Sequence, residues 1–210
     1  MEKGTIIDVG AGFGTFCEQM KESSYFEKVI GIEPSPDYAK TCRDQGLEII
    51  EKPIEEIDEN QVQADVITSF EVIEHLFEPR KYIEGCRKIL NKEGLIVITC
   101  PNFQGFDINV LKKLSNNVDV EHINYFNPES LSLLVKSCGF EVIEVMTPGV
   151  LDAELVRKKI LSKEFDVSNK PFLKKILIDK WEELGENFQR FLINNKLSSN
   201  LWIVAKKIDL

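Results

Sequence analysis

Short apolar runs alternate with amphipathic segments along the first 148 residues, and this alternation constrains the fold more than any other feature of the chain. The apolar runs predict strands and the segments between them have helical spacing. Buried strands that alternate with helices in this way predict a parallel sheet covered on both faces, with right-handed crossovers. The predicted strands span residues 4–9, 28–33, 47–51, 64–70, 95–102 and 140–148.

The predicted helices begin and end at residues typical of helix termini. One begins at Ser35, with Pro36 at its first position, and another has Asn127 as its N-cap. Glycines follow the helices as stop signals, because glycine adopts the left-handed backbone that closes a helix. The four predicted helices span residues 15–24, 35–46, 78–94 and 127–139.

The last part of the chain departs from the alternation. Residues 151–165 and 170–195 hold two helical patterns, and an apolar run follows at residues 201–207. The charge balance also changes near residue 150, from acidic to slightly basic. We therefore expect three parts, which are a core at residues 1–150, a helical insertion at residues 151–200 and a final core strand at residues 201–210.

The second helical pattern of the tail has a broad apolar face. Apolar residues recur there every three or four positions, as in an amphipathic helix. We expect this face to pack against the protein, and a substrate lid or a dimer surface is the alternative. The face consists of Phe172, Leu173, Ile176, Leu177, Trp181, Leu184, Phe188 and Phe191.

Composition limits the partners of the chain. The net charge of −9 argues against nonspecific binding of nucleic acid, because that requires a basic field, and it favours a small-molecule substrate. No apolar run approaches the ~20 residues that span a bilayer, and the start lacks the layout of a signal peptide. The five cysteines are widely spaced, without a Cys-x-x-Cys pair, which argues against a disulfide framework. We expect a cytoplasmic monomer or homodimer with no nucleic acid and no membrane as partner.

A glycine-rich loop directly follows the first predicted strand. Gly10, Gly12 and Gly14 allow a sharp turn and a close approach of the backbone to a ligand. Glu33 ends the second predicted strand, where a carboxylate can accept hydrogen bonds from both hydroxyls of a ribose. Asp8 precedes the loop and can face a cationic ligand such as a sulfonium. A dinucleotide site and a tight turn without a ligand remain as alternatives.

Five segments in order resemble the successive motifs of class I S-adenosylmethionine-dependent methyltransferases. They are "IIDVGAGFG", "VIGIEPS", "ADVITSFEVIEHL", "LNKEGLIVITCPN" and "CGFEVIEV". The resemblance covers about residues 5–146 and the last strand. It implies an α/β, Rossmann-like, seven-stranded sheet of order 3-2-1-4-5-7-6, with an antiparallel last strand. It also implies S-adenosyl-L-methionine as cofactor and S-adenosyl-L-homocysteine as product.

The resemblance assigns roles to the loop and to the strand ends. The glycine loop would lie along the methionine part of the cofactor, Glu33 would hold the ribose and Pro34 would pack near the adenine. Lys52 stands near the place where many relatives have a Gly-Asp pair, which argues against a carboxylate contact to the adenine there. The candidate cofactor-binding residues are Asp8, Gly10, Ala11, Gly12, Phe13, Gly14, Glu33, Pro34, Ser35, Pro53, Ile54, Ser69, Phe70 and Glu71.

The chain begins four residues before its first predicted strand. Relatives usually have an upstream helix that helps to close the cofactor pocket. We expect that the sequence is a fragment or that its own tail closes the site.

The two histidines lie in the segments "SFEVIEHL" and "VEHINYF", which follow the fourth and fifth predicted strands. Because these strands end at the same edge of the sheet, we expect both histidines to flank one pocket. His122, with Glu121 beside it, is the leading candidate for a general base that deprotonates the acceptor. Its segment resembles that of sugar C-methyltransferases, although their second histidine motif is replaced here by "TPGVLD".

Two other interpretations of these histidines remain open. The Glu-x-x-Glu-His pattern resembles metal-dependent ubiquinone-pathway and small-RNA methyltransferases, with Glu71, Glu74, His75 and His122 as ligands. In the other interpretation, Glu74 and His75 only support the site. We expect no metal and rank a structural role for His75 first.

The sequence therefore predicts an S-adenosylmethionine-dependent methyltransferase that acts on a small polar acceptor, a sugar or related metabolite. An NAD-dependent dehydrogenase and a cofactor-binding module without catalysis are the alternatives.

Overall fold

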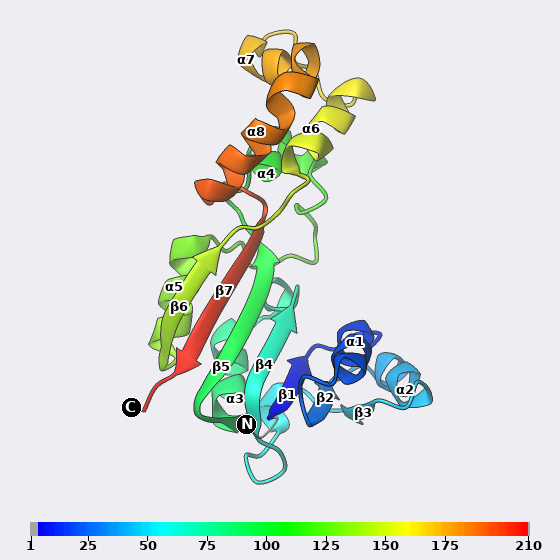
Figure 1. The fold of residues 1–210 in the computed structure, drawn as a ribbon, viewed down its shortest axis with the longest axis vertical. Helices are drawn as coiled ribbons and strands as arrows, with labels where there is room; N and C mark the ends of the chain where they lie inside the picture. Colours follow the sequence, from blue (N-terminus) through cyan, green and yellow to red (C-terminus); the bar gives the residue numbers. More distant parts are fainter. Residues whose placement is uncertain (1–3, 210) are drawn as a thin grey trace.

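The computed structural model describes residues 4–209 and contains one seven-stranded sheet (Figure 1). The strand order is β3-β2-β1-β4-β5-β7-β6, and β7 pairs antiparallel with both of its neighbours. The predicted fold class, strand order and antiparallel last strand are thus confirmed. The strands are β1 (Thr5–Val9), β2 (Lys28–Ile32), β3 (Glu48–Ile50), β4 (Ala64–Phe70), β5 (Leu90–Pro101), β6 (Phe140–Met146) and β7 (Asn200–Lys207).

Parallel pairing brings the carboxyl ends of the central strands to one edge of the sheet. In the register of β1, Asp8 lies opposite Gly31 of β2 and Thr68 of β4. The loops that follow β1, β2 and β4 therefore leave the sheet next to one another. This edge, at a topological switch point between β1 and β4, is where open α/β sheets bind ligands.

Helices pack on both faces of the sheet because the strands are apolar on both sides. The larger core joins the sheet to α3 and α5, through buried residues such as Ile83 and Leu131. A smaller core joins the opposite face to α1 and α2, through Cys17 and Cys42. The main helices of this part are α1 (Thr15–Ser23), α2 (Pro36–Asp44), α3 (Pro79–Ile89) and α5 (Pro128–Ser137).

Two helix termini differ in how well the sequence predicted them. Asn127 caps α5, since its side chain accepts from the backbone N–H groups of Glu129 and Ser130. The predicted end of α3 at Gly94 is wrong, because α3 ends at Ile89 and β5 begins at Leu90. Leu90 pairs with Ala64, and a register shift follows before the next pair. Sheet pairing of Leu90 therefore ends the helix, and no sequence signal marks it.

The helical insertion forms its own core beyond the ends of β5 and β7 (Figure 1). It contains α6 (Asp152–Leu161), α7 (Pro171–Lys174), a π-helical turn η4 (Lys175–Asp179) and α8 (Trp181–Asn194). The single helix expected over residues 170–195 is wrong. The π turn buries Ile176 and Leu177 in this core, and the chain changes direction at Lys180, whose φ of −129° is not helical.

A short helix that the sequence did not predict packs against the insertion. This helix, α4 (Phe106–Leu111), and the 3₁₀ turn η3 (Lys112–Leu114) lie between β5 and α5. Leu111 belongs to the same buried cluster as Val156 of α6. The division at residues 150 and 200 remains a prediction, and the insertion gains part of its core from outside that range.

Two buried carboxylates anchor the insertion to the sheet. Asp152 accepts hydrogen bonds from the side chains of Ser198 and Gln189 and from the backbone N–H of Ser199. Asp107 of α4 accepts from the hydroxyl of Ser199 as well. Buried carboxylates are stable only when such donors surround them, so these contacts fix the insertion and α4 to Ser198 and Ser199, directly before the start of β7.

All five cysteines lie within residues 4–209, and they are buried and free of disulfide bonds. Over the same residues, no helix combines the length and the apolar character that crossing a membrane requires.

Candidate functional site

A cavity of about 480 Å³ lies at the carboxyl edge of β1, β2 and β4. Its size is within the range of small-molecule sites, about 300–1,000 Å³. It is lined by Val9, Gly10, Gly12, Ile32, Glu33, Pro34, Tyr38, Pro53, Ile54, Glu55, Glu71, Val72, His75, Leu76 and Tyr82.

The glycine loop has a backbone that other residues rarely adopt. Gly10, Gly12 and Gly14 have φ values of 85°, 53° and 78°. A Cβ on Gly10 would lie 2.5 Å from a methyl group of Val72, whereas Gly12 has no atom within 4 Å of that position. Glycine is therefore required at position 10 for packing, and Gly12 keeps the wall of the cavity open.

Glu33 is held rigidly at the end of β2. Its two carboxylate oxygens accept hydrogen bonds of 2.8 Å from the backbone N–H groups of Gly12 and Ser35. The side chain is buried and lines the cavity. Each oxygen keeps a second lone pair, so the carboxylate can still accept from two neighbouring hydroxyl groups. This arrangement and the open space at Gly12 suit the ribose and methionine parts of S-adenosylmethionine.

Asp8 lies behind the cavity wall. It is buried and accepts a 2.7 Å hydrogen bond from the hydroxyl of Thr68. Burial raises the pKa of Asp8 from 3.8 to about 6, and the charge of Glu33 adds to this effect while the Thr68 bond opposes it.

Not every predicted cofactor residue reaches the cavity. Ser69 contacts the hydroxyl of Tyr82, and Phe13 packs against the ring of Tyr38, so both act through residues that line it. The predicted residues in the wall are Gly10, Gly12, Glu33, Pro34, Pro53, Ile54 and Glu71. Those outside it are Asp8, Ala11, Phe13, Gly14, Ser35, Ser69 and Phe70.

Several wall residues were missed by the sequence analysis. Glu55 places a carboxylate in the wall one position after Ile54, although the sequence argued against a carboxylate there. Tyr82 comes from α3 and donates to the carbonyl of Val9. The acidic pair after Ile54 was an available signal for Glu55, whereas no local signal marks Tyr38, Val72, Leu76 or Tyr82.

The two histidines meet beside the cavity, whose lining includes His75 but not His122. Their rings lie edge to face with centroids 4.7 Å apart. Nδ1 of His75 lies 3.1 Å from the carbonyl oxygen of Glu121, and Nδ1 of His122 lies 3.0 Å from that of Asn117. Since a carbonyl only accepts, each bond requires a proton on Nδ1, which leaves Nε2 of the neutral ring as a base or a ligand.

Glu121 contributes its backbone and not its carboxylate to this contact. Its side chain is exposed, while its carbonyl receives the ring of His75.

Asn124 joins the two histidine segments and was also missed. Its side-chain amide donates to the carbonyl of Leu76 at 2.6 Å and to that of Ile73 at 3.5 Å. Its backbone N–H donates to the carbonyl of Glu74 at 3.0 Å. These bonds hold the segment after β5 against the 3₁₀ turn η2 (Ile73–His75) that follows β4.

Glu74 is a buried carboxylate without a hydrogen-bond partner on either oxygen. Burial raises its pKa to about 7, and the charge of Glu71 contributes. Its Oε1 lies 3.9 Å from Nε2 of His75. Within residues 4–209, Glu74, His75 and His122 form a group whose potential ligand atoms lie within 4.8 Å of one another. Such carboxylate and imidazole groups suit a divalent ion.

Glu71 stands apart from this group, although the sequence placed it among the ligands. Its Oε1 accepts from the hydroxyl of Thr99 at 2.7 Å and from the side-chain amide of Asn200 at 3.2 Å. Strands β5 and β7 therefore hold Glu71 at the cavity mouth.

Comparison with known proteins gives a family match over most of the chain. The family model described as "Methyltransferase domain" matches residues 1–145. The chain is 24% identical over 159 residues to the C-methyltransferase NovU of Streptomyces niveus, which covers 72% of this chain and 36% of that protein. It is 30% identical over 103 residues to the ubiquinone biosynthesis O-methyltransferase of Bradyrhizobium diazoefficiens, covering 46% of this chain and 40% of that protein.

The chain thus spans well under two thirds of the length of these two relatives. Among solved structures, the SAM-dependent methyltransferase of Archaeoglobus fulgidus has a TM-score of 0.66 at 19% identity, covering 97% of this chain and 86% of that chain. At this identity the likeness shows a shared fold.

Proposed function

The chain belongs to the methyltransferase domain family of class I S-adenosylmethionine-dependent enzymes, and on this premise we propose that it methylates a small polar acceptor, a sugar or related metabolite, with His122 as general base. S-adenosylmethionine supplies an electrophilic methyl group on a positively charged sulfur. In this proposal the glycine loop lies along its methionine part, Glu33 binds the ribose hydroxyls, and the wall around Pro53 and Ile54 receives the adenine.

The assignment of His122 as base rests on its hydrogen bonding. The Asn117 carbonyl fixes the proton on Nδ1, so Nε2 of the neutral ring is free to take a proton from the acceptor. The Asn124 bridge keeps the ring next to His75, which lines the cavity. Alignment of the acceptor would supply most of the rate, and proton removal would add about 10²–10⁴-fold.

The choice of a sugar is supported by the "EHINYF" segment, which resembles that of sugar C-methyltransferases, and the C-methyltransferase NovU is among the relatives. Because ubiquinone biosynthesis O-methyltransferases are also among the relatives, an O-methylated metabolite is the alternative product. Neither a nicotinamide cofactor nor an idle module is favoured by the comparisons. We also propose that the enzyme works in the cytoplasm on a small-molecule substrate, as a monomer or homodimer.

A divalent ion is a second candidate for the histidine group. The observation that favours it is the Glu74 carboxylate, which has no hydrogen-bond partner and lies in one group with the imidazoles of His75 and His122. If an ion binds there, Glu74, His75 and His122 would hold it, and it would polarise the acceptor. Activity that is unchanged by EDTA and by added Mg²⁺ would rule this candidate out.

The proposal is tested by methyl transfer from radiolabelled S-adenosylmethionine to a panel of methyl glycosides and quinols. His122→Asn should lower turnover by about 100-fold or more while the affinity for S-adenosylhomocysteine stays the same. His75→Asn is the matched control and should have a smaller effect. Near-normal turnover of His122→Asn would contradict its role as base, and labelling of quinols alone would contradict the sugar.

A further inference from the structure

A second cavity, of about 280 Å³, lies beside the cofactor cavity, and Glu71 lines both. Its walls come from the end of β4, the start of β7 and the loop between β6 and α6. The lining residues are Glu71, Asn117, Pro148, Gly149, Val150, Leu151, Asp152, Leu155, Ser199 and Asn200.

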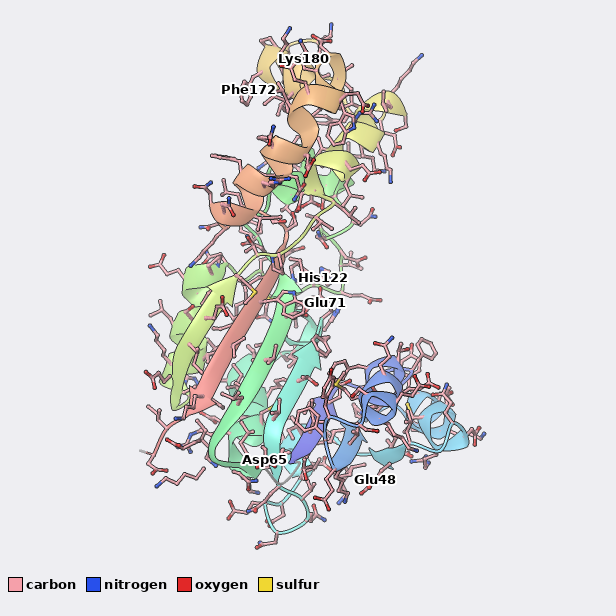
Figure 2. All side chains as sticks on the ribbon, viewed as in Figure 1. Glu48, Asp65, Glu71, His122, Phe172 and Lys180 are labelled. Atoms are coloured by element: carbon pink, nitrogen blue, oxygen red, sulfur yellow. The ribbon has the colours of Figure 1, made fainter. Side chains whose placement is uncertain are left out.

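The second cavity also reaches the residue that holds the proposed base. Asn117 lines it, and the carbonyl oxygen of Asn117 accepts from Nδ1 of His122 at 3.0 Å. In Figure 2, Glu71 and His122 both lie at the ends of β4 and β5, below the helical insertion. A ligand in this cavity would thus border the cofactor cavity at Glu71 and would lie against Asn117, the residue that holds the ring of His122.

The structure holds Glu71 at this junction at a backbone cost. Its φ of 54° is unusual for a residue other than glycine. The backbone N–H of Glu71 donates to the carbonyl of Thr99 at 3.1 Å. The bonds from Thr99 and Asn200 both go to Oε1, so Oε2 is available to a ligand. Residues in such strained conformations cluster at functional sites.

The lining of the second cavity carries negative charge only. It contains the carboxylates of Glu71 and Asp152 and no Lys, Arg or His. Asp152 is buried, and its oxygens are occupied by Ser198, Ser199 and Gln189. An anionic ligand group would lose water and face like charges here, whereas hydroxyl and ammonium groups could donate to Glu71 and Asn200.

We propose that this second cavity holds the methyl acceptor, and that the reacting end of the acceptor carries hydroxyl or ammonium donors and no negative charge. Glu71 accepts a hydrogen bond from the acceptor and orients it toward the cofactor cavity. This inference rests on the proposed methyltransferase function and adds the place and the chemistry of the acceptor. The loop of residues 148–151 and helix α6 then form one wall of the acceptor site.

The test uses the full chain saturated with S-adenosylhomocysteine and follows backbone amide resonances by NMR. The probes are propane-1,2-diol, ethanolamine and sodium glycolate, which share a small size and differ in charge. The diol and ethanolamine should shift the amides of Gly149 and Asn200, whereas glycolate should bind about tenfold more weakly or not at all. The amide of Gly46 lies in the α2–β3 turn, outside the cavity lining, and serves as the reference that should not shift.

Three variants give the test its controls. Leu155→Trp should fill the cavity and abolish the shifts, whereas Leu161→Trp, on the same helix but outside the lining, should retain them. Glu71→Gln should weaken ethanolamine about tenfold and the diol less, because only the ammonium loses a charge-assisted bond. Equal losses for both probes would assign the contact to hydroxyl groups.

Failure of this inference is distinct from failure of the proposed function. If S-adenosylhomocysteine does not bind in calorimetry, the proposed function fails. If it binds, and glycolate shifts the same amides as strongly as ethanolamine, the assigned acceptor chemistry is wrong. If it binds and none of the probes shifts these amides, or if Leu155→Trp retains the shifts, the cavity is not the acceptor site.

Discussion

The imidazole rings of His75 and His122 lie edge to face, 4.7 Å apart between centroids, although the residues belong to loops after different strands. Asn124 is the link between these loops, because its side chain and backbone donate to three carbonyls of the turn that contains His75. The histidine pair is therefore a product of loop docking at the edge of the sheet.

Asn124→Ala should separate the two histidines. The variant loses its side-chain bonds to buried carbonyls, which should lower the free energy of unfolding by about 1–3 kcal/mol. Because the chain has only two histidines, their ring resonances can be followed by NMR, and both should shift.

The matched control is Asn109→Ala, whose side chain donates to the carbonyls of Phe103 and Gly105 away from the histidines. It should leave both ring resonances in place. Unchanged histidine resonances in Asn124→Ala would show that the bridge does not hold the pair.

Glu33→Gln should weaken the binding of S-adenosylhomocysteine about tenfold or more. The glutamine amide replaces one carboxylate oxygen with a donor that faces the N–H of Gly12 or Ser35, and the charge proposed to bind the ribose is lost. Calorimetry measures the change. Glu51→Gln, an exposed carboxylate paired with Arg43, is the control and should bind normally. If Glu33→Gln binds S-adenosylhomocysteine with unchanged affinity, the proposed contact between Glu33 and the ribose is wrong.

Gly10→Ala should lower the stability of the protein more than Gly46→Ala does, although both glycines have a positive φ. In each variant, the left-handed backbone of the alanine should lower the free energy of unfolding by about 1–2 kcal/mol. Gly46 has open space at the Cβ position, whereas Gly10 has a Val72 methyl group 2.5 Å away. Thermal denaturation should show a larger drop for Gly10→Ala, together with weaker binding of S-adenosylhomocysteine. If the melting temperature drops equally in the two variants, the Val72 side chain moves away from the new methyl group at little cost.

Asp8→Asn should change how stability depends on pH. The raised pKa of Asp8, about 6 against 3.8 in an unfolded chain, means that the native state binds the proton more tightly. Its contribution to stability is complete below pH 3.8 and is lost as the pH rises through 6.

Asparagine does not ionise, so the stability of Asp8→Asn does not decrease in this way as the pH rises. Its stability relative to the wild type should therefore rise by about 2–3 kcal/mol between pH 4 and pH 7. Urea denaturation at a series of pH values measures the difference. A difference that does not change with pH would show that Asp8 has an ordinary pKa.

The sequence was most informative where local signals agree with the sheet. Strands bounded by glycine and the N-cap at Asn127 could be placed, because backbone conformation and side-chain capping act within a few residues. The end of α3 and the π turn before α8 could not. Pairing of Leu90 with Ala64 and burial of Ile176 and Leu177 set these features, and both depend on partners far along the chain.

The residues of the candidate site also differ in whether the sequence could predict them. The glycine loop and Glu33 follow from their positions at strand ends, so the sequence could predict them. Glu55 and Tyr82 enter the cavity wall from other elements, and the second cavity exists only because the insertion docks on β7 through Asp107 and Asp152.

The sequence by itself determined the alternating strands and helices, the family and the methyl donor, because these depend on periodicity and on contiguous motifs. Only the tertiary structure decided that His75 meets His122, that Glu74 is buried without a partner, and that Glu71 joins two cavities. The physical reason is that these relationships depend on hydrogen bonds and packing between loops distant in sequence, whose strength no local pattern encodes.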